Sequence, residues 1–179
     1  MATNEPNIEV LFSSADIEKR NQELAEQIER DMGKDILVIA VLKGSFVFAA
    51  DLIRAMHYAG VKPQIDFMAL SSYGDKTISS GTVVITRDIM DTVKDRKVLL
   101  IDDILESGRT MDFAAKELLD RGAAMVKTCL MLDKKGKRIL DFEADFVGFD
   151  CPDLFVIGYG LDYAHYYREL PYIGHIVTD

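Results

Sequence analysis

Cysteine is scarce in this chain: only Cys129 and Cys151 occur, and they form no CxxC spacing. We therefore expect neither a disulfide framework nor a structural zinc site. The first ten residues contain no basic cluster and no apolar run, which argues against a secretion signal. The longest apolar block, residues 36–42, is too short to cross a bilayer, so we expect a cytoplasmic protein without a membrane partner.

Positive charge is also in short supply. The chain has 21 Lys and Arg against 30 Asp and Glu, which gives a formal net charge of −9. Such an acidic balance disfavours nucleic acid as the main partner. Internal repeats, linkers and low-complexity tracts are absent from the sequence, and a length of 179 residues fits one domain with a full core. We therefore expect a single domain over residues 1–179.

A strand that ends in acidic residues is predicted in the middle of the chain. Residues 98–101 form an unbroken apolar block, which is typical of a strand buried on both faces. Asp102 and Asp103 stand where this strand ends, and Glu106 adds a third carboxylate to the same loop. Three neighbouring carboxylates repel one another unless a cation or a hydroxyl-bearing ligand relieves them.

The turn that follows has the residue types of an anion site. Gly108 allows close backbone approach, Ser107 and Thr110 supply hydroxyl donors, and a helical pattern begins directly afterwards. An ordinary turn with a Ser/Thr helix cap and a surface acidic pair is the alternative. The sequence matches neither a Walker P-loop nor a dinucleotide fingerprint. We expect a ligand with a phosphate for the turn and hydroxyls or magnesium for the acids.

The whole stretch, VLLIDDILESGRT, resembles the 5-phosphoribosyl 1-pyrophosphate (PRPP) motif of the type I phosphoribosyltransferases. The resemblance implies that Asp102 and Asp103 lie under the ribose hydroxyls of PRPP. It also implies that the loop of residues 107–110, which includes Arg109, wraps the 5′-phosphate. The motif leaves the acceptor base open.

A second unit of strand, polar loop and helix is predicted over residues 36–58. Lys43 and Gly44 follow its strand, at the end of an open α/β sheet where ligands bind. Most loop lysines are simply solvated, but this position makes Lys43 a candidate pyrophosphate contact. The block LKGSF resembles the pyrophosphate loop of the hypoxanthine-guanine phosphoribosyltransferases. Whether the Leu42–Lys43 peptide is cis is left open by the sequence.

Residues 71–81 form a long polar segment without apolar periodicity. A plain hairpin connection is one interpretation, and a functional loop is the other. Ser72 and Tyr73 match the start of the family's flexible lid, which would close over the reacting centre and exclude water.

Two segments of the C-terminal half resemble base-binding parts of the same family. Lys134 opens a basic run that by itself indicates a solvated turn, but by resemblance it donates to the exocyclic oxygen of a 6-oxopurine. In PDLFVIGYGLDY, the resemblance implies that Phe155 stacks on the purine and that the backbone of Val156 reads its edge. From pattern alone, Phe155 is better explained as a core residue.

The remaining expected site residues also come from the resemblance. Asp162 would reach magnesium together with Asp102 and Asp103, and Arg168 matches an arginine that contacts pyrophosphate. Glu106 departs from the family, which usually carries aspartate there as the base near purine N7. Reference pKa values of about 4.3 for Glu and about 3.9 for Asp leave geometry to decide. We expect Glu106 to serve as the base; alternatively, it only lines the loop.

The resemblance extends from about residue 8 to residue 177, through separate blocks in the same order. It implies a Rossmann-like parallel α/β sheet flanked by helices, with a small hood built largely from the C-terminal part. The implied enzyme is magnesium-dependent and belongs to purine salvage, joining PRPP to N9 of hypoxanthine or guanine to give IMP or GMP and pyrophosphate. It would be a homodimer or homotetramer. A xanthine- or guanine-preferring enzyme and an RNA-binding regulator on the same fold remain as alternatives.

Overall fold

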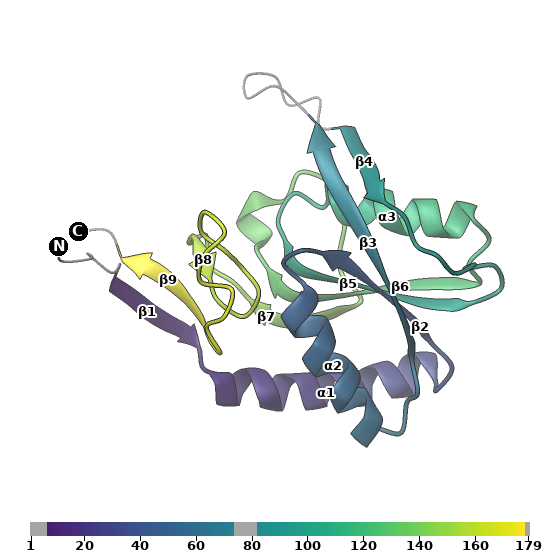
Figure 1. Cartoon of the computed structure of the whole chain (residues 1–179), viewed down its shortest axis with the longest axis horizontal. Coiled ribbons are helices and arrows are strands. Elements are labelled where there is room, and N and C mark those ends of the chain that lie inside the picture. The colour runs from purple at the N-terminus through teal and green to yellow at the C-terminus, as the bar shows by residue number, and fades with distance from the viewer. Residues whose placement is uncertain (1–6, 74–81, 178–179) are drawn as a thin grey trace.

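The larger of two sheets organises the molecule, a computed structural model that describes residues 7–73 and 82–177 (Figure 1). Its strand order is β4-β3-β2-β5-β6-β7, and every neighbouring pair is parallel except β3 and β4. The expected parallel α/β sheet is therefore confirmed, with one antiparallel strand at its edge. The strands are β2 (Leu37–Leu42), β3 (Gln64–Tyr73), β4 (Thr82–Arg87), β5 (Lys97–Leu105), β6 (Met125–Asp133) and β7 (Phe146–Asp150).

Helices cover both faces of this sheet. Helices α1 (Ser14–Met32) and α2 (Phe46–Tyr58) pack on one face, and α3 (Arg109–Asp120) packs on the other. Along β2, Val38 and Ala40 belong to the core under α1 and α2, while Leu37, Ile39 and Val41 belong to the core under α3. Burial on both faces explains why this strand is an unbroken apolar run. No helix within the described ranges is long and apolar enough to span a membrane.

Helix α1 begins at a capping box. The backbone N–H of Asp16 donates to Ser13 Oγ, and the N–H of Ser13 donates to Asp16 Oδ2, both at 3.2 Å. These bonds satisfy two of the free N–H groups at the helix start. The hydrogen bonds also hold the pKa of Asp16 below its usual value. The start of α1 is thereby fixed, and with it the positions along the helix that face the sheet.

A second, three-stranded sheet forms the hood, in the order β1-β9-β8. It consists of β1 (Asn7–Phe12), β8 (Val156–Ile157) and β9 (Ile173–Val177), all antiparallel. Figure 1 shows that β1 and β9 bring the two ends of the chain side by side. The hood therefore includes an N-terminal strand as well as the expected C-terminal part. Two short strands alone are marginal in water, and β1 supplies the third.

Two boundaries differ from the sequence-based expectation. Strand β5 does not end at Asp102, because its ladder with β6 continues through Leu105, which pairs with Asp133. The acid pair therefore lies within the strand rather than after it. Strand β3 runs through Ser72 and Tyr73, so the start of the expected lid continues the sheet. The rest of that expected lid, residues 74–81, lies outside the described residues.

Candidate active site at the carboxyl ends of β2 and β5

The central pair of strands, β2 and β5, marks the place where the strand order reverses. From β2 the chain adds β3 and β4 outward on one side, and from β5 it adds β6 and β7 on the other. The loops after β2 and β5 therefore leave the sheet in different directions. Open α/β sheets bind ligands in the crevice at such a switch point.

The loop after β2 touches the acid pair directly. A Cβ added to Gly44 would lie 1.6 Å from Asp103 Oδ2, so only glycine fits there. The buried Ser45 hydroxyl donates to the Val41 carbonyl at 2.5 Å and holds the loop against its own strand. The Leu42–Lys43 peptide is cis, and Lys43 is exposed. Lys43 thus follows β2 directly, at the carboxyl end of the sheet where the strand order reverses.

The acid pair is buried and electrostatically unfavourable. Burial, followed by repulsion from Asp103, raises the pKa of Asp102 well above its usual value. Burial also raises the pKa of Asp103, although hydrogen bonds with Asp102 and with backbone N–H groups, and to a lesser degree the Arg168 guanidinium, oppose this. Backbone N–H groups of Asp103 and Ile104 donate to the two carboxylates at 2.9 and 2.8 Å. The pair is therefore ordered and ready to accept a cation or ligand hydroxyls.

A cavity of about 160 Å³ lies between the end of β5 and the start of α3. Gly108, with φ of 84°, occupies the N-cap position, and no side chain caps the start of α3 there. The Ser/Thr-capped turn is therefore wrong; instead Ser107 Oγ accepts from the N–H of Arg109 at 3.3 Å. The cavity thus lies at the N-terminus of α3, where a helix carries unpaired backbone N–H groups and favours anions. Its lining includes Asp102, Glu106, Ser107, Gly108 and Thr110.

Lys134 is buried, with 6% of its surface exposed. Its Nζ donates to Glu106 Oε1 at 2.9 Å, and its N–H donates to the Leu105 carbonyl at 2.9 Å. A solvated turn is therefore the wrong description of Lys134. That description suits Lys135 and Lys137, which are exposed and pair with surface aspartates. The sequence could not separate these lysines, because all belong to one basic run.

The base-binding segment, as we name residues 152–163 after their expected role, presents the aromatic side chain of Phe155 to solvent. Phe155 is 57% exposed, which contradicts its interpretation as a core residue. Its ring meets the ring of Tyr163 edge-on, with centroids 5.6 Å apart. Phe155 lies just before the two-residue strand β8, outside the hood sheet, so it is not buried as a strand residue of the core would be. Val156 itself is buried and pairs with His175 of β9.

Asp162 and Arg168 form an ion pair beside this segment. The distance from Arg168 Nη2 to Asp162 Oδ1 is 2.7 Å, and Arg168 Nη1 donates to the Gly160 carbonyl at 2.5 Å. The second oxygen of Asp162 accepts from the N–H of His165. Asp162 is therefore already partnered, and the Arg168 charge lies close enough to Asp103 to lower the pKa of that carboxyl slightly.

Two contributing residues were not identified from the sequence. Arg138 pairs with Asp133 and donates to the Glu106 carbonyl at 3.2 Å, joining the loops after β5 and β6. It was hidden in the basic run. Tyr159 is a buried tyrosine that links α1 and α2 to the base-binding segment. Its only signal in the sequence is its position between two glycines.

Comparison with known proteins gives consistent matches over nearly the whole chain. The phosphoribosyl transferase domain family matches residues 8–164. The hypoxanthine-guanine phosphoribosyltransferase of Aquifex aeolicus is 44% identical over 96% of both chains. That of Bacillus subtilis is also 44% identical, over 92% of this chain and 91% of its own. The solved Bacillus anthracis enzyme with HEPES in its active site has a TM-score of 0.89 and 42% identity, covering 97% of this chain and 100% of its own.

We expect Asp102→Asn to raise the free energy of unfolding at pH 7 in metal-free buffer. A carboxyl whose pKa is raised by folding binds its proton more tightly in the folded chain than in the unfolded one. As pH rises through the folded pKa, ionisation therefore lowers stability, by about 1.4 kcal/mol for each unit of difference. Asparagine removes this loss. Urea denaturation in the presence of a chelator measures the free energy of unfolding of both proteins.

The difference from the wild type should shrink as pH falls toward the unfolded value of about 3.9, where both forms are neutral. Asp120→Asn, at an exposed position of α3, is the matched control and should leave the urea midpoint unchanged. A lower midpoint for Asp102→Asn at pH 7 would contradict the prediction.

Proposed function

The chain belongs to the phosphoribosyl transferase family, among the hypoxanthine-guanine phosphoribosyltransferases, and we propose that the crevice at β2 and β5 is its active site. It is a purine salvage enzyme that uses PRPP. The reaction transfers the phosphoribosyl group to N9 of hypoxanthine or guanine and releases pyrophosphate. The observation that carries the site assignment is the contact of Gly44 with Asp103, since it joins the two loops that the substrate needs.

PRPP is held in three places in this proposal. Its 5′-phosphate occupies the 160 Å³ cavity, where Ser107, Gly108, Arg109 and Thr110 begin helix α3. Its ribose hydroxyls lie at the acid pair. Its pyrophosphate meets the residues at the loop after β2, Lys43 and Gly44, together with Arg168. Local cations at these positions offset the net charge of −9, which would otherwise repel a polyphosphate.

Magnesium fits the donor set of this site. Asp102 and Asp103 are adjacent carboxylates whose pKa values are raised by burial, and a cation relieves that cost. Among the described residues, no three His, Cys, Asp or Glu side chains group to hold a metal ion. This suits Mg²⁺, which is usually bound by one or two carboxylates plus substrate phosphates. Asp162 would contribute only by exchanging its partner Arg168. The bound ion would supply charge neutralisation for the leaving pyrophosphate.

The purine is recognised by a buried cation and an exposed ring. Lys134 donates to the exocyclic oxygen of a 6-oxopurine, whereas the amino group of adenine would place a donor against a donor. Phe155 offers an exposed face on which the base stacks, and the Val156 backbone reads its edge. Support comes from the burial of Lys134, which places its charge inside the protein rather than in solvent.

Glu106 takes the proton from purine N7 as N9 bonds to the ribose. Its carboxylate is 47% exposed and lies 2.9 Å from Lys134 Nζ, so the proposed base and the proposed oxygen donor face the same space. The longer side chain of glutamate reaches Lys134 from the loop after β5. A purine that binds Lys134 therefore lies within reach of Glu106. Ser72 and Tyr73, at the end of β3, are also proposed to contact the substrate.

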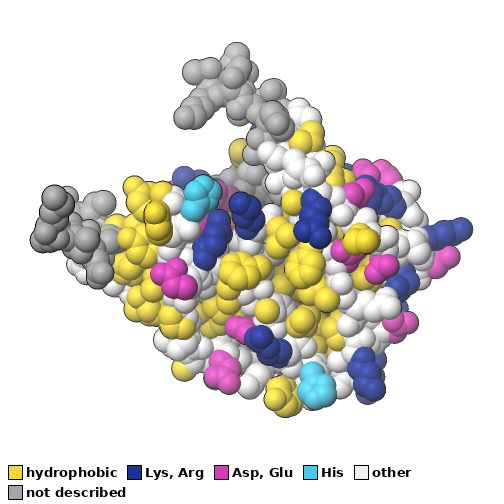
Figure 2. Space-filling view, viewed as in Figure 1, with side chains coloured by type: hydrophobic (Ala, Val, Ile, Leu, Met, Phe, Trp, Pro, Cys, Tyr) yellow, Lys and Arg dark blue, Asp and Glu magenta, His cyan; other side chains and the backbone are white. Residues whose placement is uncertain are grey.

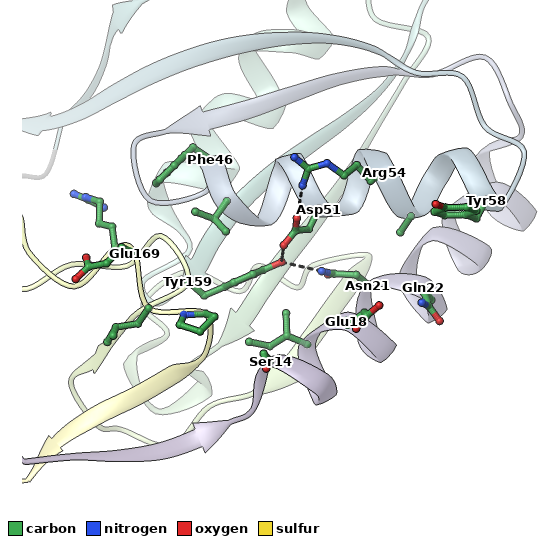
Figure 3. A pocket seen from close by; sticks show the side chains of 16 residues that line it. Ser14, Glu18, Asn21, Gln22, Phe46, Asp51, Arg54, Tyr58, Tyr159 and Glu169 are labelled. Carbon is green, nitrogen blue, oxygen red and sulfur yellow. Dashed lines mark hydrogen bonds and ion pairs between the residues drawn. The ribbon is translucent and has the colours of Figure 1, made fainter.

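We also propose that the enzyme is a homodimer or a homotetramer. A groove of about 770 Å³ runs between α1, α2 and residues 168–171, and hydrophobic side chains gather on this face (Figures 2 and 3). Phe46 and Tyr58 are 45% and 87% exposed at its edge. In a Trypanosoma cruzi relative, 35% identical with a TM-score of 0.91, the C-terminal region was studied for its role in the oligomeric state. Sedimentation velocity measures the state of this chain directly.

Steady-state rates with PRPP and each of four bases test the function. Hypoxanthine and guanine should react, and adenine should be slower by roughly a hundredfold or more, because it leaves the lysine donor unpaired. A preference for xanthine would favour the alternative enzyme. Absence of any transfer, together with salt-dependent RNA retention on filters, would instead favour the RNA-binding regulator.

Lys134→Ala should weaken purine binding more than PRPP binding, because the proposed contact is only with the base. Loss of a charged donor to a buried carbonyl costs about 1–3 kcal/mol, or roughly a 5- to 150-fold rise in KM for hypoxanthine. Lys135→Ala, in the exposed neighbour, is the matched control. Unchanged kinetics with hypoxanthine and guanine would remove Lys134 from base recognition.

Glu106→Gln should slow the chemical step by roughly a hundredfold or more, the usual scale of general acid–base catalysis. The amide has nearly the same shape but accepts no proton. Glu106→Asp should keep most of the activity if the loop adjusts to the shorter side chain. Single-turnover rates measure the step, and a wild-type rate for the glutamine variant would show that the proton leaves by another route.

A further inference from the structure

Tyr159 is a buried tyrosine whose hydroxyl joins two helices, as Figure 3 shows. Its side chain is 5% exposed. Asn21 Nδ2, from α1, donates to the hydroxyl at 2.8 Å, and the hydroxyl donates to Asp51 Oδ2, from α2, at 2.9 Å. Burial raises the pKa of Tyr159 above its usual range, so the hydroxyl keeps the proton that it donates. The tyrosine is therefore tied to both helices at once.

The backbone at Tyr159 has a conformation that the side chain must help to hold. Tyr159 has φ of 51°, between Gly158 at 91° and Gly160 at 99°. A non-glycine residue in this region is strained and persists where its surroundings over-determine it. Its N–H donates to the Leu170 carbonyl at 2.8 Å, and its hydroxyl supplies the second anchor. Both anchors fix the turn of residues 158–160, which connects Val156 on one side with Asp162 on the other.

The same turn, residues 158–160, packs against the proposed pyrophosphate loop. A Cβ on Gly160 would lie 2.2 Å from the Gly44 carbonyl oxygen, and Gly44 in turn touches Asp103. Helix α2, which contains Asp51, begins at Phe46, directly after that loop. The base-binding segment thus meets the pyrophosphate loop twice: once by backbone at Gly160, and once through the hydroxyl of Tyr159 on the helix that the loop starts.

We infer that Tyr159 is a positioning residue that couples the purine side of the site to the pyrophosphate side. The inference rests on the proposed function, because it assigns the purine to residues 155–156 and pyrophosphate to Lys43 and Gly44. Two points of attachment resist rotation of one segment against the other, where a single contact would act as a pivot. Ordering of one segment by its ligand therefore orders the other. Reacting atoms gain when both are held in place together.

Tyr159→Phe tests the coupling, because it keeps the ring and removes only the hydroxyl. The dissociation constant of PRPP with Mg²⁺ is measured by calorimetry, alone and with a saturating hypoxanthine analogue that has carbon in place of N9 and cannot react. In the wild type the analogue should tighten PRPP binding within the usual range for coupled sites, roughly 5- to 150-fold. In Tyr159→Phe the two constants should agree within about twofold, while PRPP binding alone stays near the wild-type value.

A second route removes the acceptor of the same hydrogen bond. Asp51→Ala should lose the coupling as Tyr159→Phe does, and the double variant should be no worse than either alone. It also carries the test if Tyr159→Phe does not fold. Tyr58→Phe, an exposed tyrosine of α2 in the same groove, is the matched control and should keep the coupling. Sedimentation of each variant separates a lost coupling from a changed assembly.

The outcomes distinguish the inference from the function beneath it. If the wild type transfers phosphoribosyl groups but shows no coupling, or if both variants keep it, Tyr159 does not position the site. If the variants lose PRPP affinity even without the analogue, the tyrosine has only a structural role and the inference is wrong. If the wild type transfers to no purine, the proposed function itself is overturned, and this inference with it.

Discussion

A backbone loop lies directly against a buried carboxylate at the centre of this molecule. Gly44 leaves no room for a Cβ beside Asp103, and a Cβ on Gly160 would lie 2.2 Å from the Gly44 carbonyl oxygen. The loop after β2 is therefore packed closely against the Asp103 carboxylate of β5 and against the backbone of the segment that follows β8. Any side chain at either glycine would push these segments apart. The order of the whole site depends on this contact, because each segment carries a different group of proposed ligand-binding residues.

Charge is arranged around that contact in a way that the overall composition hides. The chain carries a net charge of −9, yet Lys134 and Arg168 each face a carboxylate at the site, at 2.9 and 2.7 Å. Burial raises the pKa values of the acid pair, Asp102 and Asp103, above their usual range. The protein thus holds unfavourable charge where a ligand with a metal ion can relieve it.

The loops after β5 and β6 form a single structural unit. The Ser107 carbonyl accepts from the N–H groups of Ile139 and Leu140, and Arg138 donates to the Glu106 carbonyl. Hydrogen bonds therefore join the proposed phosphate turn to the segment that contains Lys134, the proposed donor to the base. The two segments are about thirty residues apart in the sequence, as the contact between residues 106 and 138 shows. Such a junction keeps a bound ribose and a bound purine in register with each other.

The sequence by itself predicted the parallel sheet with its helices and most of the residues proposed for the site. Apolar runs such as residues 36–42, followed by a small polar loop and a helical period, specify buried strand–loop–helix units without reference to the rest of the chain. Local motifs identified the acid pair, the anion turn and Lys43, and family resemblance suggested Lys134 and Phe155. These features are readable because their signals lie within a few neighbouring residues.

Only the tertiary structure decided what depends on distant partners. Lys134 is buried and its neighbours Lys135 and Lys137 are not, because Glu106 lies opposite the first alone. Phe155 is exposed just before the short strand β8, and the turn at residues 158–160 is held in part by the bonds of Tyr159 to α1 and α2. Hydrogen bonds between residues more than a hundred positions apart leave no local pattern. The burial of these residues and their hydrogen-bond partners therefore follow only from the folded structure.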